Sequence, residues 1–152
     1  MPNFLRTIRL DDGDTRIFDT AAPAGEWAVS GAFAFSVLRR DEIAGRTGNA
    51  FARGFLGLDS FGRSTLTVVT EVGTHDLAQV ERRLAEHLVA RYGAPTLALA
   101  FPAAGEEIAL ILGLAQAAAI GTLMTVRRSF DADARITETF AGLEPPSTVS
   151  LP

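Results

Sequence analysis

The chain lacks two residue types on which much enzyme chemistry depends. It has no cysteine, and all of its 14 basic residues are arginine, so it has no lysine either. The first absence excludes thiolate nucleophiles, disulfides, iron–sulfur clusters and cysteine-ligated zinc. The second excludes a Schiff base on a side-chain amine. The remaining candidate acids, bases and nucleophiles are two histidines, one tyrosine, the carboxylates and the hydroxyls.

A positive net charge and a long apolar N-terminal run are also missing. The formal net charge is -4 at pH 7, and phosphate backbones are bound through a basic field that such a chain does not provide. The segment 1–10 alternates apolar with polar or charged residues, whereas a secretory signal needs a continuous apolar stretch. We therefore expect a cytoplasmic protein that does not bind nucleic acid.

The composition that is present predicts one globular domain. The chain has 152 residues, of which 47% are hydrophobic, enough to bury a core without a metal or a disulfide. We expect a single domain over residues 1–143. The following segment, 144–152, contains three prolines and predicts an extended tail.

Several segments have the period-two pattern of β-strands. Residues 4–10 and 15–19 flank Asp12-Gly13, a strong signal for a hairpin turn. Residues 26–37 alternate bulky with small side chains, which predicts a long strand. Further strands are predicted over 64–72, 122–130 and 134–141, the last two joined by a turn at 131–133.

Helical patterns occur in three places. Over 76–92 the apolar residues repeat with a period of 3.6, and Gly93 and Pro95 mark the end of the helix. A short helix is predicted around 48–55. Residues 108–126 carry no charge, which raises the question of a membrane span, but the glycines and polar residues favour a buried helix over 106–119 and a break at Gly121. We expect no membrane association.

These elements predict an α+β fold. We expect a mostly antiparallel sheet of about five or six strands, with the 76–92 and 106–119 helices packed on one face. The bulky side of strand 26–37 and the apolar stripe of helix 76–92 are predicted to pack against each other.

One glycine-rich loop is a candidate ligand site. Gly57 to Ser64 superficially matches a phosphate-binding loop, but a β-rich segment rather than a helix follows it, and the lysine is missing. A weaker possibility is an anion site built from arginines around this loop. Its candidate residues are Arg46, Arg53, Arg63 and Ser64. The alternative is that nearby acidic residues neutralise each arginine.

The sequence gives little support for a metal site. His75 and His87 do not share a helix face in the way a metal-binding pair does. The acidic turn at 11–14 lacks the spacing of a calcium loop. We therefore predict no metal, no cofactor and no catalytic residue.

Two segments resemble a known family. Gly25-Glu-Trp-Ala-Val-Ser-Gly-Ala-Phe-Ala-Phe35 and Gly54-Phe-Leu-Gly-Leu-Asp-Ser-Phe-Gly-Arg-Ser-Thr65 are similar to segments of a small family of bacterial proteins of unknown function. The resemblance extends over most of the chain. It implies a single bacterial domain and no particular activity.

Two functions remain open. The apolar composition and the depleted catalytic inventory favour a non-enzymatic binding or assembly module that forms homo-oligomers. The alternative is a binder, or an enzyme, that uses the loop over 46–64 for a metabolite bearing a phosphate or carboxylate. A deep polar pocket containing Arg63 would favour the alternative, and an apolar patch buried across a two-fold axis would favour the module.

Overall fold

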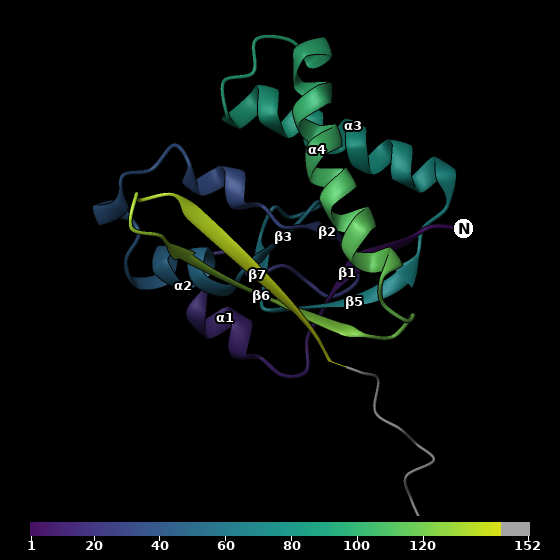
Figure 1. Cartoon of the computed structure of the whole chain (residues 1–152), viewed down its shortest axis with the longest axis horizontal. Coiled ribbons are helices and arrows are strands. Elements are labelled where there is room, and N and C mark those ends of the chain that lie inside the picture. Colours follow the sequence, from purple (N-terminus) through teal and green to yellow (C-terminus); the bar gives the residue numbers. More distant parts are fainter. Residues whose placement is uncertain (144–152) are drawn as a thin grey trace, which may run out of the picture.

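A seven-stranded antiparallel sheet organises residues 1–143, the part of the chain that the computed structural model describes (Figure 1). The strand order is β4-β3-β2-β1-β5-β6-β7. The strands are β1 (Asn3–Ile8), β2 (Trp27–Val29), β3 (Phe55–Gly57), β4 (Arg63–Ser64), β5 (Leu66–Glu71), β6 (Leu123–Phe130) and β7 (Ile136–Leu143). The helices are α1 (Gly13–Ile17), α2 (Gly45–Arg53), α3 (Thr74–Arg91) and α4 (Leu97–Gln116), with 3-10 turns η1 (Ala32–Phe35) and η2 (Arg40–Glu42).

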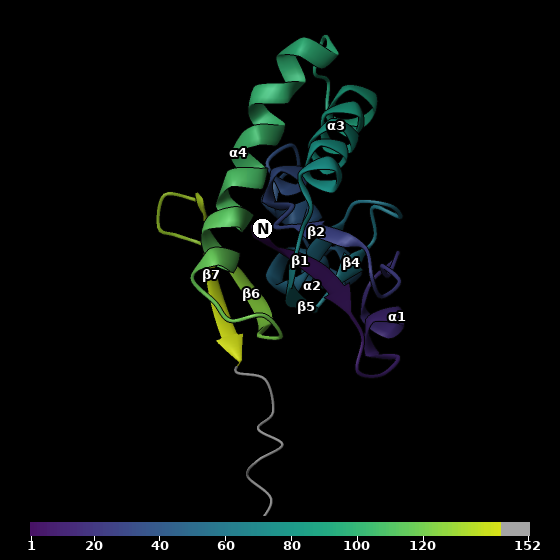
Figure 2. The ribbon, with the colours of Figure 1, turned by 90° about the vertical axis from the view of Figure 1, so that its right-hand side faces the viewer.

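The predicted α+β class is confirmed, with more strands than expected. The additional strands include β3 and β4, short segments at the two ends of the glycine-rich loop over 57–64. The two long helices pack along each other on one side of the sheet (Figure 2), and α4 crosses β1 and β2. Their apolar stripes and the central strands form one core, represented by Leu5, Val69, Leu84 and Ile111, all fully buried.

The N-terminal hairpin prediction is wrong. β1 does not turn back at Asp12-Gly13 but lies in the middle of the sheet, paired with β2 on one side and β5 on the other. The predicted second strand is instead the short helix α1. Asp11 accepts a hydrogen bond from the Gly13 amide, and the buried Asp14 carboxylate accepts bonds from the amide and hydroxyl of Thr65. These contacts anchor α1 beside β5 and outweigh the local turn signal.

The long strand predicted over 26–37 is also wrong. β2 ends at Val29, and the backbone at Gly31 has a φ of 78°, outside the extended region. The chain then forms η1, so the alternation of bulky and small residues after Val29 does not come from a strand. Trp27 packs on Phe4 and lines a pocket with α3 residues, whereas Phe35 packs on Phe51 of α2.

The helix predictions hold better. α3 covers nearly all of the predicted 76–92 segment, and Gly93 adopts a left-handed φ of 77° just after it. The short helix predicted at 48–55 is α2, shifted towards the N-terminus. α4 begins well before the predicted 106, because the Thr96 side chain caps the Leu99 amide. The uncharged stretch 108–126 is divided between α4, a turn and β6, as predicted from Gly121.

α4 is long and apolar enough to cross a membrane by length and composition, although a helix of a soluble core can pass the same test. Only 22% of its most apolar 18-residue window is buried in the described domain. Leu99 and Leu110 are 63% and 39% exposed. The helix therefore presents apolar surface that the rest of residues 1–143 does not cover.

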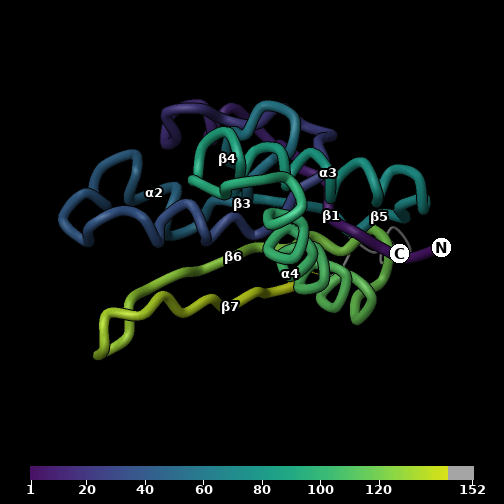
Figure 3. The backbone as a smooth tube through the Cα atoms, turned by 90° about the horizontal axis from the view of Figure 1, so that it is seen from above, coloured from purple at the N-terminus to yellow at the C-terminus, as the bar shows by residue number. Residues whose placement is uncertain are grey.

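The last two strands form the predicted terminal hairpin. β6 and β7 pair over eight residues each, although β7 starts and ends two residues later than the predicted 134–141. The hairpin makes one long side of the molecule (Figure 3). The predicted tail over 144–152 lies outside the described residues.

Candidate functional site

Two buried arginines from opposite parts of the sheet share hydrogen-bond acceptors. Arg63 on β4 is 8% exposed and Arg128 on β6 is 5% exposed. Four strands lie between them in the strand order, yet both guanidinium groups donate to the carbonyl oxygens of Ser30 and Gly54. The sheet must therefore curl strongly, and the arginines lie where its two halves meet.

Arg128 has a complete set of partners. Its Nη1 donates to carbonyls in the last turn of α2, those of Ala50 and Phe51, and to that of Gly54. Its Nε donates to Oε2 of Glu138 on β7 at 2.8 Å. The negative end of the α2 dipole and the carboxylate both favour a cation here. Arg128 therefore joins α2 and the terminal hairpin to the centre of the fold.

Arg63 is different, because it has no carboxylate partner. Within residues 1–143 its guanidinium makes no ion pair, and it donates only to the carbonyls of Ser30, Gly31 and Gly54. Each of these oxygens has a second donor: Arg128 for Ser30 and Gly54, and the Ala34 amide for Gly31. The backbone around Arg63 would thus stay satisfied without it.

Burial, followed by the nearby Arg128, lowers the pKa of Arg63 to about 9. Arg63 is therefore still a cation at neutral pH. Two buried guanidinium groups face one directly bonded carboxylate, that of Glu138. A buried cation without a bonded anionic partner is costly, and the more distant charges of Glu107 and Glu138 offset only part of the effect of burial on Arg63.

Arg63 also lines an open pocket of about 370 Å³. The pocket contains Arg91 and Tyr92 from the end of α3 and His87 one turn earlier. Its other lining residues are Thr20, Leu56, Ser60 and Phe61. No acidic residue of the described segment 1–143 lines it. We call this set the Arg63 pocket.

The aromatic wall of the Arg63 pocket is held in a defined geometry. The Phe61 and His87 rings stack face to face, with centroids 3.7 Å apart. Tyr92 meets His87 edge-on. Phe61 has a φ of 55°, a left-handed conformation that is uncommon for a bulky residue. Such strain is found most often at functional sites.

The electrostatics of the pocket are positive. Burial is the main cause that lowers the pKa of His87, and the charges of Arg91 and Arg63 lower it further. Burial and, after it, the charges of these two arginines therefore favour the neutral form of the imidazole. A bound anion would oppose both charges.

A second, more apolar groove lies on the other side of this cluster, between α4 and β7. Glu107 and Glu138 line it together with Phe33, Leu88 and Leu110. Burial, and then the neighbouring Glu138, raise the pKa of Glu107 to about 7, although Arg128 and Arg63 act in the opposite direction. The groove thus contains a carboxyl group that titrates near neutrality.

The raised pKa of Glu107 predicts that the stability of the fold depends on pH. The folded pKa of Glu107 lies above its usual 4.5, so ionisation removes stability as the pH rises from about 4.5 to about 7. Glu107→Gln is expected to raise the free energy of unfolding by on the order of 1 kcal/mol at about pH 8, after allowance for solvent screening, and to change it little at about pH 4. Urea unfolding at both pH values measures this. Glu71→Gln, at an exposed position outside the groove, should show no such difference, and equal effects from the two variants would contradict the assignment.

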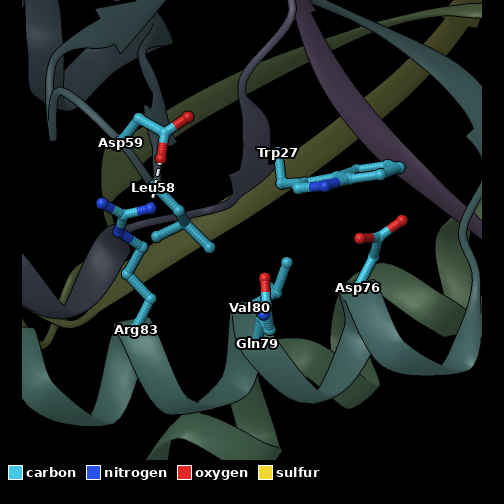
Figure 4. Close-up of a pocket in the computed structure, with 7 residues that line it drawn as sticks. All are labelled: Trp27, Leu58, Asp59, Asp76, Gln79, Val80 and Arg83. Carbon is cyan, nitrogen blue, oxygen red and sulfur yellow. Dashed lines mark hydrogen bonds and ion pairs between the residues drawn. The ribbon is translucent and has the colours of Figure 1, made fainter.

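A third pocket, between Trp27 and α3, is smaller, and one of its two acidic residues is in an ion pair. Figure 4 shows Trp27 above Val80, with Asp59 and Arg83 joined by an ion pair on one side. Arg6 lies 3.7 Å from the centroid of the Trp27 ring. The volume of about 70 Å³ leaves room for little more than water. We therefore regard it as structural.

The structure does not gather the four residues predicted as an anion site. Arg46 is exposed and donates to the Phe18 carbonyl, and Arg53 is exposed and bonds Asn49 within α2. The buried Ser64 hydroxyl bonds the Leu66 carbonyl. Only Arg63 reaches a pocket, and its neighbours there come from α3 rather than from the loop.

Sequence reasoning missed Arg128, Arg91, Glu107 and the role of His87. One signal was available for Arg128. Along β6 it follows Met124 and Val126 at intervals of two, so it occupies a position on the buried face of the strand. A charged residue in such a row predicts a buried partner. Among residues 1–143, no group of three or more His, Cys, Asp or Glu side chains could hold a metal ion.

The fold and the pocket together define a small α+β domain with a buried, partly unpaired arginine cluster. A family model matches residues 1–150, and the chain belongs to that family, described as a family of unknown function (DUF6505). This confirms the resemblance to a family of unknown function. No curated protein and no solved structure matches the chain significantly.

Proposed function

We propose that this domain binds a small molecule through a carboxylate or phosphate group in the Arg63 pocket. The observation that carries the proposal is Arg63 itself: a buried cation without a carboxylate partner among residues 1–143, whose backbone acceptors all have other donors. Burying such a charge lowers the stability of the fold, and the hydrogen bonds of the surrounding backbone do not depend on it. A ligand that supplies the missing negative charge gives it a role.

The pocket has the groups that this ligand chemistry needs. Arg63 and Arg91 offer planar donor groups that suit carboxylate and phosphate oxygens. His87 becomes a third cationic donor when an anion raises its pKa again. The stacked rings of Phe61 and His87, with Tyr92, form a wall for the flat or apolar body of the molecule. We propose a metabolite rather than a macromolecule, because the site is a pocket.

A thermal-shift panel with sulfate, inorganic phosphate, succinate and citrate tests the proposal. We expect at least one of these anions to raise the Tm of the wild type in a saturable way. Arg63→Met should abolish that shift, and Arg91→Ala should weaken binding roughly 10- to 100-fold, as expected for the loss of a charged hydrogen bond. Arg82→Ala is the matched control, because Arg82 is an exposed α3 residue that pairs with Glu86 away from the pocket.

The comparison with Arg63→Met also removes non-specific effects, since sulfate stabilises most proteins slightly. Binding should strengthen as the pH falls through the range in which His87 titrates, because the protonated imidazole favours the anion. Sulfate is the probe for this measurement, since its own charge is constant there. A panel in which every anion shifts the wild type and Arg63→Met equally would contradict the proposal.

A second candidate function is the assembly module predicted from composition. The exposed apolar surface of α4 favours it. The two candidates are compatible, because the Arg63 pocket and the outer face of α4 share no residue. A cytoplasmic location, and the lack of a nucleic-acid or membrane partner, remain part of the proposal on the grounds of charge and composition.

A further inference from the structure

The β7 strand forms a long edge of the sheet. It pairs with β6 over all eight of its residues, from Ile136 to Leu143, and with no other strand of residues 1–143. At the opposite edge, β4 has only two residues. A free edge presents unpaired amides and carbonyls and is a template for a further strand.

The register identifies which backbone groups are free. The Asp131 amide donates to the Arg135 carbonyl at the turn, and bonded and non-bonded pairs alternate along an antiparallel ladder. The odd-numbered residues of β7 therefore bond to β6. The even-numbered ones direct their amides and carbonyls outwards, namely Ile136, Glu138, Phe140 and Gly142.

This edge lacks the features that usually prevent strand addition. It contains no proline and no lysine, and its register with β6 shows no bulge. Its one charged residue, Glu138, is bonded to Arg128 and Ser30 of the same chain. Of its side chains, Thr137, Thr139 and Ala141 are exposed and uncharged.

We propose that β7 pairs antiparallel with β7 of a second copy of this chain, to give a two-fold dimer with one continuous sheet. A strand with free outward groups along its length is complementary to itself under a two-fold axis. With Thr139 opposite Thr139, the four outward-facing residues of each copy face those of the other. Both Glu138 carboxylates keep their own Arg128.

Charge favours a second copy over a charged partner. A strand of a basic or acidic protein would find no opposite charge on the exposed β7 side chains, whereas the exposed side chains of two β7 strands carry no charge and do not repel each other. The strand is about 27 Å long, so strand pairing alone buries less than a standard interface. We therefore expect a reversible dimer with a Kd on the order of micromolar.

Thr139→Lys tests the dimer. It places two like charges opposite each other on an exposed position, so it should give a monomer, while the matched Thr139→Ala variant keeps the dimer of the wild type. An equimolar mixture of Thr139→Lys and Thr139→Glu should restore a dimer. Light scattering coupled to size exclusion, over concentrations from below to well above micromolar, measures the mass, and circular dichroism confirms that each variant is folded.

A wild type that stays monomeric at the highest concentration would overturn the proposal. So would a dimer that persists in Thr139→Lys, because the interface would then lie elsewhere, for example on α4. Loss of the dimer in Thr139→Lys alone, with rescue in the mixture, would support it. The anion panel is independent of either result, since no β7 residue lines the Arg63 pocket.

Discussion

Arg128→Met is expected to lower the free energy of unfolding by about 3–5 kcal/mol, the cost of breaking a buried ion pair from one side. Methionine keeps much of the volume but none of the donors. Glu138 would lose its cation, and the carbonyls at the end of α2 would lose a donor. The total stability of a domain is about 5–15 kcal/mol, so this variant should be close to unfolding. Urea denaturation measures the loss.

Arg63→Met is the control for that experiment, because it also removes a buried guanidinium group, one that shares two carbonyl acceptors with Arg128. Its carbonyl acceptors keep other donors, and it relieves the repulsion between the two guanidinium groups. We expect a change within about 1 kcal/mol of the wild type, in either direction. If both variants lose equal stability, Arg63 is a structural residue and the argument for a ligand fails.

Gly31→Ala is expected to lower the free energy of unfolding by about 3 kcal/mol. A Cβ at this position would lie 2.6 Å from both the Leu56 Cβ and the Arg63 Nη1, and the φ of 78° strains any other residue. Leu56 is fixed in β3, so the strand would have to shift. Urea denaturation measures the loss.

Gly93→Ala separates the steric clash of the added Cβ from the conformational strain of a positive φ. Gly93 has a φ of 77°, but nothing lies within 4 Å of its added Cβ. Its loss should be about 1 kcal/mol, the conformational strain alone. Equal losses in Gly31→Ala and Gly93→Ala would contradict the close approach of Arg63 and β3 to Gly31.

Local patterns predicted the elements whose neighbours in space are also neighbours in sequence. The 3.6 period of α3 and the left-handed Gly93 after it are both local, as is the turn that joins β6 to β7. The hairpin expected at Asp12-Gly13 failed for the opposite reason. Its first strand, β1, finds its partners in β2 and β5.

The pairing of β1 explains why a strong turn signal was overruled. As a central strand, β1 forms backbone hydrogen bonds on both edges, which together contribute more than one two-residue turn. At Gly31 the alternation of bulky and small residues continued, but the backbone left the extended region. The bulky residues there pack against different neighbours, so the period of two in the sequence does not correspond to one face of a strand.

The sequence by itself determined the class of fold, most of the helices and the exclusion of cysteine and lysine chemistry, because composition and periodicity report burial directly. Only the tertiary structure decided which arginines matter. Arg63 and Arg128 meet because the sheet curls, and they share backbone carbonyls as acceptors. Every residue has a carbonyl, so no pattern of side chains along the chain identifies the ones that will gather around a cation.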